Sequence, residues 1–470
     1  MQNKKQIFNP YLPSYEYIPD GEPHVFDGRL YIYGSHDRFG GDDYCMNDYV
    51  CWSAPLEDLS DFRYEGVIYR KDQHPIQYER NYYFAPDVAK GKDGRYYLYY
   101  SVAHSSIMSV AVCDTPAGQY EYLGDVHDKT GHVIGSSVGD FYQFDPGVFV
   151  DDDGRVFLFS GFCPGKLEDE EGRKYVGCHM CELEEDMLTV KDGPKIVIDR
   201  NDSSFEGARY FEAPSLRKFA GKYYLIYSAR CGGLHYCVSD RPDGDYVYAG
   251  CIHSTSDIGI NGHTQDNPVY PNGNTHGSLV ELNGKYYIFD HRLTNHSSFC
   301  RQGVAEQVFF DENGYIAQVE STSCGLNDGP LVGQGTYPAY IACALMDFNA
   351  YTDKEERGRM TPRITQDGED RECEPGQYIR GIRKNCLIGY KYFDFKRCKS
   401  VTLKVRGDAD GLLSIKFTED GEAFASIPIK LAGADWSEVE VPFALTRTKC
   451  AFYITFDGEG AFDLLEFEFI

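Results

Sequence analysis

The sequence predicts an all-β protein in which a five-bladed β-propeller is followed by a jelly-roll-like β-sandwich domain. Three observations predict this fold: an aromatic- and glycine-rich composition, a hairpin phrase that recurs five times, and short apolar runs after the last repeat. The 470 residues include 38 Tyr, 29 Phe and 48 Gly. Aromatic side chains suit the half-buried face of a pleated strand, and glycine suits tight turns.

The recurring phrase consists of a turn, a Gly followed by Lys or Arg, and a run of aromatic and aliphatic residues. Its glycines are 66, 60, 67 and 63 residues apart, at Gly28, Gly94, Gly154, Gly221 and Gly284. Each copy has the pattern of a β-hairpin whose Asp-Gly or Asn-Gly supplies a positive φ, although the fourth copy has Ala220 before its glycine. A unit of this length accommodates the four strands of one propeller blade. The alternative is one large sandwich with five similar hairpins, and the regular spacing favours the propeller.

We expect the propeller to occupy residues 1–322 and the sandwich to occupy residues 323–470. The repeat stops near Ser321, and the glycine-rich segment 325–336 has the composition of a linker. Beyond it, short runs such as 400–405 and 450–454 have the alternating apolar character of strands in a sandwich.

Composition and charge exclude several classes of partner. Lys and Arg number 46 and Asp and Glu number 73, which gives a formal net charge of −27. Such an acidic surface repels phosphate backbones and anionic lipid headgroups, so we expect neither nucleic acid nor a membrane as a partner. No segment approaches the roughly 18–20 apolar residues that span a bilayer, and the N-terminus has no stretch like that of a signal peptide. We therefore expect a cytoplasmic location, unless a leader has been removed.

Cysteine usage agrees with a reducing compartment. The 16 cysteines are scattered, many of them inside apolar strand-like runs. The CxxC of Cys178 and Cys181 has no second pair to complete a zinc site. We interpret the cysteines as reduced core residues.

An ionisable residue precedes each repeat glycine by seven to nine positions: Asp20, Asp87, Asp145, Glu212 and His276. The first strand of each propeller blade runs along a central channel, so these side chains are expected to meet at one mouth of it. Crowded carboxylates raise one another's pKa and cost stability, which indicates an active site or a cation site. Paired carboxylates in a concave site suit glycoside hydrolysis. A cation site and a lectin-like pocket remain the alternatives.

The segments that carry these residues resemble glycoside hydrolase family 43. They are 20–26, 84–88, 144–149, 211–215 and 274–278, one in each blade, and the resemblance covers residues 1–320. It implies a five-bladed propeller enzyme that inverts the configuration at the anomeric carbon. It also implies that Asp20 is the general base, that Glu212 is the general acid, and that Asp145 keeps the pKa of the acid high.

The resemblance also implies residues that bind substrate and a metal. His276 resembles a histidine on the channel floor near a calcium ion or a water cluster, so a structural Ca²⁺ reached through water is the implied metal. Arg301 resembles an arginine that donates to sugar hydroxyls, and Arg292 is a weaker candidate for the same role. Phe84 and Asp87, from the second motif, complete the predicted substrate-binding set.

Two departures from the family pattern affect these assignments. Phe84 stands where the family usually has Trp, so the stacking wall differs. Asp20 is followed by Gly21 where the family commonly has Pro, and Glu22 is the residue that precedes a proline. Since residues two apart on a strand point to the same face, Glu22 is a rival for the general base.

The function we expect is that of an inverting exo-glycosidase acting on neutral arabinoxylo-oligosaccharides. It would remove terminal α-L-arabinofuranosyl or β-D-xylosyl residues and would need no cofactor for its chemistry. An endo-arabinanase and a propeller that binds sugar or calcium without hydrolysis are the alternatives. The presence of both an acid and a base argues against the latter. The C-terminal domain resembles sandwich modules attached to this family, some of them related to family-6 carbohydrate-binding modules, and we expect it to brace the propeller.

Overall fold

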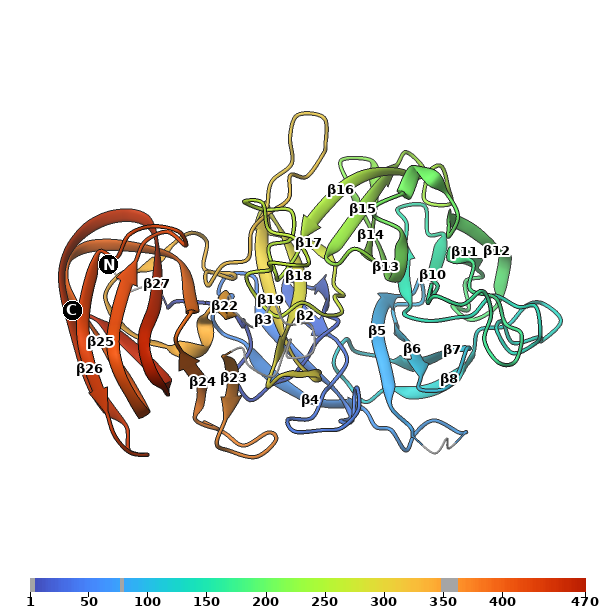
Figure 1. Cartoon of the computed structure of the whole chain (residues 1–470). Coiled ribbons are helices and arrows are strands. Elements are labelled where there is room, and N and C mark those ends of the chain that lie inside the picture. The colour runs from blue at the N-terminus through green and yellow to red at the C-terminus, as the bar shows by residue number, and fades with distance from the viewer. Residues whose placement is uncertain (1–4, 77–79, 348–361) are drawn as a thin grey trace.

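The computed structural model of the chain describes residues 5–76, 80–347 and 362–470 (Figure 1). In that part of the chain, regular structure consists of 27 strands and two short 3-10 helices, η1 (Ser203–Phe205) and η2 (Ala339–Ile341). The predicted all-β fold class, a five-bladed propeller with a second β domain, is confirmed.

Five antiparallel sheets form the blades, and in each the strands follow chain order. Blade one contains β1 (Glu22–Phe26), β2 (Arg29–Tyr33), β3 (Tyr49–Pro55) and β4 (Arg63–Tyr69). Blade two contains β5 (Tyr83–Lys90), β6 (Tyr96–Val102), β7 (Met108–Cys113) and β8 (Glu121–Asp125). Blade three contains β9 (Gly147–Val150), β10 (Val156–Ser160), β11 (Gly177–Leu183) and β12 (Val190–Asp199). Blade four contains β13 (Tyr210–Phe219), β14 (Lys222–Ala229), β15 (Leu234–Ser239) and β16 (Val247–His253), and blade five contains β17 (Leu279–Leu282), β18 (Lys285–Thr294) and β19 (Ser297–Val308).

The five predicted hairpins join the first two strands of each blade. Two-residue turns at 27–28, 220–221 and 283–284 have both residues at positive φ, as a type I′ turn requires. Blades two and three have five-residue connections at 91–95 and 151–155 instead. The repeated phrase therefore marks the same hairpin with two different turn lengths.

Five apolar clusters fill the spaces between neighbouring blades. Tyr33 and Tyr100, for example, belong to the cluster between blades one and two, and Leu30 and Phe289 to the cluster between blades one and five. The other three clusters join blades two with three, three with four, and four with five. This cyclic arrangement explains the abundance of tyrosine and phenylalanine, because each blade needs an apolar layer on both faces.

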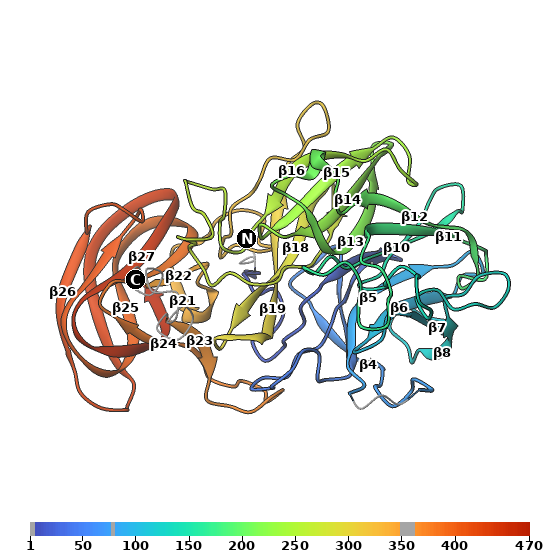
Figure 2. The ribbon, with the colours of Figure 1, turned by 45° about the vertical axis from the view of Figure 1, so that its right-hand side comes forward.

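The second domain is one curled eight-stranded sheet (Figure 2). Its strands are β20 (Leu331–Val332), β21 (Gly335–Pro338), β22 (Ala344–Asp347), β23 (Arg363–Gln366), β24 (Gln377–Arg383), β25 (Cys386–Lys416), β26 (Ala425–Leu431) and β27 (Ser437–Phe469). Val401 of β25 pairs with both Val441 and Phe469 of β27, so each long strand folds back to pair with the other twice. Tyr390, Phe452 and Phe467 lie in the enclosed core.

The two domains share a packed interface. Val269 and Tyr270, from the loop between β16 and β17, belong to the core of the second domain. The segment 325–336, predicted as a linker, is packed against the domains: it contains β20, and Leu326 and Leu331 are buried. Lys391 of β25 reaches into the propeller, where its Nζ lies 2.8 Å from Asp257 Oδ2.

Eleven of the 16 cysteines are buried, as predicted for core residues, whereas Cys373 is exposed. All 16 are free thiols, and Cys178 and Cys181 are buried in two different core clusters on β11. Within the described residues, no helix has the length and apolar character needed to cross a membrane.

The buried pair of Lys391 and Asp257 makes a prediction about stability. Lys391→Met leaves Asp257 buried without its cation, which we expect to lower the free energy of unfolding by about 3–5 kcal/mol. Thermal unfolding measures the effect, and the double variant Asp257→Asn with Lys391→Met should recover part of the loss. The matched control is Lys384→Met, which removes an exposed ion pair to Asp457 and should leave the melting temperature nearly unchanged. Equal melting temperatures for the two lysine variants would contradict this prediction.

Candidate active site

A pocket with a volume of about 840 Å³ opens where the chain enters the innermost strands of the blades. Six of the predicted site residues line it: Asp20, Phe84, Asp145, Glu212, His276 and Arg301. The pocket wall also contains residues that the sequence did not single out, among them Tyr44, Cys45, Phe144, Phe162, Phe211 and Arg230. Asp87, Arg292 and Glu22 do not line it.

A left-handed backbone residue lies just before the innermost strand, or near its start, in four of the blades. These residues are Asp20, Ala85, Asp145 and Ala213, with φ between 43° and 62°. A non-glycine residue in this conformation carries strain, and such residues cluster at active sites. The turn brings the carboxylates of Asp20 and Asp145 into the pocket. Residues two positions further on, such as Glu22 and Asp87, lie below the pocket inside the channel.

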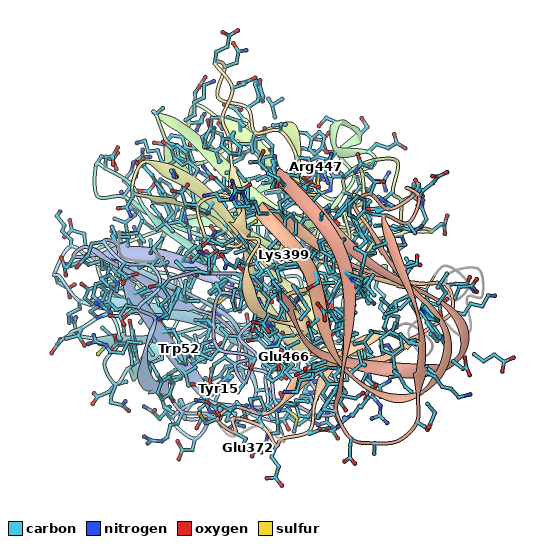
Figure 3. All side chains as sticks on the ribbon, turned by 90° about the vertical axis from the view of Figure 1, so that its left-hand side faces the viewer. Tyr15, Trp52, Glu372, Lys399, Arg447 and Glu466 are labelled. Carbon is cyan, nitrogen blue, oxygen red and sulfur yellow. The ribbon has the colours of Figure 1, made fainter. Side chains whose placement is uncertain are left out.

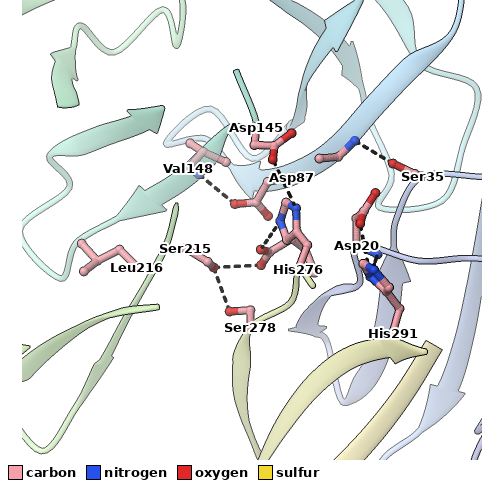
Figure 4. A network of polar contacts seen from close by, with 12 residues as sticks. Asp20, Ser35, Asp87, Asp145, Val148, Ser215, Leu216, His276, Ser278 and His291 are labelled. Carbon is pink, nitrogen blue, oxygen red and sulfur yellow. Dashed lines mark hydrogen bonds and ion pairs between the residues drawn. The ribbon is translucent and has the colours of Figure 1, made fainter. Parts of the chain in front are cut away.

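Asp20 is held as a carboxylate. It is buried, and Arg301 donates from Nη1 to its Oδ1 and Oδ2 at 2.9 and 3.2 Å. Burial alone would raise the pKa of Asp20, but the Arg301 guanidinium, with His291 and His276, lowers that pKa to about 2. Figure 4 shows Asp20 above the His291 ring, whose Nδ1 lies 3.3 Å from Asp20 Oδ1.

Asp145 and Glu212 have the opposite electrostatic environment. Burial raises the pKa of Asp145 to about 7, with a further contribution from Asp20 and an opposing one from His276. Burial and the neighbouring Asp145 raise the pKa of Glu212 well above its usual range. Two carboxyl groups in one poorly solvated site cannot both ionise readily, so the pair retains a proton near neutral pH. Glu212 is the partly exposed member of the pair, on the pocket wall.

His276 connects the pocket with the channel below it. Its Nδ1 lies 3.7 Å from Asp145 Oδ2, and its Nε2 lies 3.6 Å from Glu22 Oε1 (Figure 4). Burial opposes protonation of the ring, but Glu22, Asp145 and Asp20 together raise the pKa of His276 to about 9. His276 is therefore a cation at neutral pH. It compensates the charge of Asp145 in the pocket and of Glu22 in the channel.

Asp87 lies in the channel below the pocket and does not line the pocket itself. Asp87 is completely buried, and its carboxylate lies 2.6 Å from His24 Nε2 and accepts the N–H groups of Val88 and Val148. Asp87 in blade two occupies the position that Glu22 occupies in blade one. Ala85 occupies the left-handed position that Asp20 has in blade one. The structure thus places Asp87 outside the pocket that Asp20, Asp145 and Glu212 line.

Glu22 also lies in the channel and is not exposed to the pocket. Its Oε2 accepts hydrogen bonds from the guanidinium of Arg217 and from Ser215 Oγ. The expectation that Asp20 and Glu22 face the same way is wrong, because Asp20 lies before β1 at φ 56° and breaks the strand alternation. The geometry therefore favours Asp20 over Glu22 as the group that contacts substrate.

Arg292 is likewise outside the pocket. Its Nη1 donates to the carbonyl of Ala342 in the second domain, and its Nη2 donates to Gln302 Oε1, both at 3.0 Å. His291 and Arg292 are successive residues of β18 and point to opposite faces. Arg292 therefore joins the two domains at a place outside the pocket.

The residues around His276 fit direct coordination of calcium poorly. Ca²⁺ takes six to eight oxygen ligands. Glu22, His24 and Asp87 offer ligand atoms within 4.8 Å of one another. However, both Asp87 oxygens and Glu22 Oε2 already accept hydrogen bonds, which leaves Glu22 Oε1 as the unbonded carboxylate oxygen of this described cluster. A protonated His276 is not a metal ligand.

Four phenylalanine rings in series form an aromatic wall of the pocket. Phe84, Phe144, Phe162 and Phe211 come from blades two, three and four, and neighbouring rings in this series lie 5.0–6.1 Å apart. Phe84, Phe144 and Phe211 each begin a blade motif, so their shared position was a sequence signal for all three. Phe162 comes after β10, where no such repeat marked it.

The chain is similar in sequence to known proteins. A sequence profile described as Glycosyl hydrolases family 43 matches residues 18–316. A xylosidase/arabinosidase of Thermoclostridium stercorarium is 47% identical over 475 residues, covering 99% of this chain and 99% of the relative. Xylosidase/arabinosidase 43A of Humicola insolens is 31% identical and covers 64% of this chain and 96% of its own length.

Solved structures show the same fold. A family 43 arabinoxylan arabinofuranohydrolase from Bacillus subtilis, in complex with cellotetraose, is 20% identical with a TM-score of 0.53, covering 98% of this chain and 97% of its own. A family 43 beta-xylosidase/alpha-arabinofuranosidase from a compost microbial metagenome, described as a calcium-free form with xylotriose, is 27% identical with a TM-score of 0.54 and covers 67% of this chain and 98% of its own. The chain therefore belongs to glycosyl hydrolases family 43 and is a glycoside hydrolase.

Proposed function

We propose that this glycoside hydrolase is an inverting exo-glycosidase that removes terminal α-L-arabinofuranosyl or β-D-xylosyl residues from neutral arabinoxylo-oligosaccharides. The observation that carries the proposal is the electrostatic asymmetry of one pocket, in which Asp20 has a pKa near 2 and Glu212 has a strongly raised pKa. An ionised carboxylate and a protonated carboxyl group are the base and the acid that glycoside inversion needs. The names of the relatives supply the two sugars.

Asp20 is proposed as the general base. Its carboxylate takes a proton from a water molecule while the water oxygen forms a bond to the anomeric carbon. Arg301 keeps Asp20 ionised and directs it, because the guanidinium donates to both carboxylate oxygens. Inversion needs the base and the acid to be about 6.5–9.5 Å apart, so that the water fits between the base and the sugar.

Glu212 is proposed as the general acid. It donates its proton to the glycosidic oxygen as the bond between that oxygen and the anomeric carbon breaks, and the leaving sugar departs as a neutral alcohol. Asp145 raises the pKa of Glu212 by its charge and so keeps the proton available. After product release, Asp20 loses its proton to solvent and Glu212 regains one, which restores the starting state.

The remaining pocket residues are proposed to bind the sugar. Arg301 and the aromatic wall both line the pocket, where the guanidinium can donate to hydroxyl groups and a phenyl face can cover the C–H face of a sugar ring. Because the chain is a glycoside hydrolase, the alternative of a propeller that binds sugar or calcium without hydrolysis is set aside. No step of this reaction runs through a metal, and a calcium ion held below His276 through water molecules remains a prediction.

We also propose a cytoplasmic location. The 16 free cysteines, 11 of them buried, support this proposal, because reduced thiols are typical of that compartment.

Glu212→Gln tests the general acid. We expect turnover of xylo- and arabino-oligosaccharides to fall by about 10²–10⁴-fold, because the leaving sugar needs the proton. Aryl glycosides should lose much less activity, since nitrophenolate leaves without protonation. The matched control is Glu206→Gln, the same chemical change at an exposed residue outside the pocket, which should retain wild-type rates. Equal losses on both substrate classes would contradict the assignment of Glu212.

The stereochemical course tests inversion directly. Proton NMR of the first-formed sugar should show α-xylose from β-D-xylosides and β-arabinofuranose from α-L-arabinofuranosides, before mutarotation mixes the anomers. Release of the sugar with its original configuration would rule out Asp20 as a base acting through water.

His276→Gln tests the role of the positive charge between the pocket and the channel. Removing this cation should raise the pKa of Asp20 and of Glu212, because His276 lowers both. Activity is lost below the pKa of the base and above the pKa of the acid, so both limbs of the kcat/KM profile should move to higher pH, by about one unit or more. His179→Gln is the control: His179 is buried with a pKa of about 4, so its loss removes no charge at neutral pH. Limbs that stay at their wild-type positions in His276→Gln would show that His276 is neutral in the enzyme.

A further inference from the structure

The loop between β2 and β3, residues 34–48, controls the position of Arg301. Asp37 in this blade-one loop is completely buried and accepts hydrogen bonds from Arg301 N at 3.1 Å, Nε at 2.8 Å and Nη2 at 2.9 Å. The remaining nitrogen, Nη1, is the one that donates to Asp20. Tyr44 of the same loop lies in the pocket wall, with its ring 5.0 Å from the guanidinium. Movement of the blade-one loop would therefore move the cation that faces Asp20.

The second domain holds this loop through Asp370. Asp370 lies in residues 367–376, between β23 and β24, which we call the docking loop (Figure 1). Its Oδ1 accepts the N–H of Phe39 at 2.7 Å, and its Oδ2 accepts Nδ2 of Asn47 at 3.0 Å. Asn47 Nδ2 also donates to the carbonyl of Asp37 at 2.9 Å. One carboxylate of the second domain thus fixes both sides of the blade-one loop.

Arg371 of the docking loop holds the start of the blade-one loop. Its Nη1 lies 2.9 Å from His36 Nε2 and 2.8 Å from Glu16 Oε1. Burial and the Arg371 charge lower the pKa of His36 to about 3, so the neutral ring accepts a hydrogen bond from Arg371. The Arg371 guanidinium also covers the ring of Tyr64 at 5.2 Å.

Figure 3 looks onto this side of the molecule. It labels Glu372, the neighbour of Arg371, at the same edge as Tyr15 and Trp52 of the propeller. Tyr64 packs against Trp52 with ring centroids 5.4 Å apart, and Trp52 is 6.4 Å from Tyr15. The docking loop therefore contacts two parts of the propeller: the strands of blade one and the blade-one loop.

We propose that Asp370 and Arg371 are positioning residues of the active site, through which the second domain holds Asp37 and Arg301 against Asp20. This inference rests on the proposed function, in which Asp20 is the general base. The second domain does more than brace the propeller, because its docking loop bonds to the segment that orients the cation of the base. If the docking loop is released, Arg301 loses its fixed geometry and Asp20 loses the charge that keeps it ionised.

The rest of the interface allows the docking loop to be tested separately. Lys391 bonds to Asp257 and to Glu320, and Tyr392 donates to Glu320; none of these residues belongs to either loop. The apolar core that includes Tyr270 also spans the domains. Breaking the contacts of Asp370 alone should therefore leave the domains associated.

Asp370→Ala, measured as kcat/KM against pH on aryl glycosides, tests the proposal. The acid limb should move up by about one pH unit, because weaker contact with Arg301 raises the pKa of Asp20. At neutral pH kcat/KM should fall by about tenfold through a higher KM, because Arg301 also contacts the sugar. The matched control is Glu320→Ala, which removes two contacts between the same domains from a partly buried carboxylate and should keep the wild-type profile.

The outcomes separate this inference from the proposed function. An active wild type whose acid limb stays unmoved in Asp370→Ala overturns the inference alone. An equal shift in Glu320→Ala also overturns it, since the effect would then come from general loosening of the interface. If Asp370→Ala does not fold, Asp370→Asn is read in the same way, because an amide has one acceptor oxygen and cannot accept from both Phe39 and Asn47. A folded wild type with no turnover of any arabinoside or xyloside would refute the proposed function itself.

Discussion

The burial of several like charges at the centre of the propeller is the constraint on which the site depends. An uncompensated carboxylate in such a place costs several kcal/mol, so each one needs a cation or a set of N–H donors. Arg301 compensates Asp20 and Arg217 compensates Glu22, at opposite levels of the channel. His276 lies between the levels and faces acids of both. From the pocket into the channel, the cations are therefore Arg301, His276 and Arg217.

Chemical asymmetry follows from this distribution. Blades one and five supply Asp20 and its guanidinium, whereas blades three and four supply Asp145 and Glu212, which are flanked by phenylalanine rings. Where a cation forms hydrogen bonds with the carboxylate, the pKa falls, and where burial dominates, it rises. A ring of similar side chains therefore provides an ionised carboxylate on one side and a protonated carboxyl group on the other. The strained left-handed residues beneath them hold the two groups at the same mouth of the channel.

Much of this arrangement was predictable from the sequence, because the repeat places equivalent residues at equivalent points of each blade. Spacing alone could not resolve the register within a motif. Asp87 and Asp145 both lie seven to nine residues before a repeat glycine, yet Ala85 occupies the left-handed position in blade two. A difference of two residues moves a carboxylate from the pocket to the channel. The orientation of Arg292 away from the pocket follows from strand alternation, since its neighbour His291 faces Asp20.

The second domain was harder to predict, because its geometry depends on contacts far apart in the chain. The predicted run at 400–405 is only part of one strand of 31 residues, β25, whose pairing with β27 changes register repeatedly. Local patterning does not show that a strand continues through a bend. The docking loop is also defined by partners more than 300 residues away.

The second domain packs where the first and last blades of the propeller meet, and the closure of the ring explains this position. A propeller ring closes where its first and last blades meet, and here a bridge between Gly21 and Gly277 joins them beside the pocket. Blade five has three strands, and Arg292 of its β18 bonds to the second domain. Asp20 and Arg301 come from opposite sides of this closure, so their geometry depends on how tightly the first and last blades are held together. A domain that bonds to both blades stabilises the pairing of Asp20 with Arg301, while Asp145 and Glu212 lie within the continuous part of the ring.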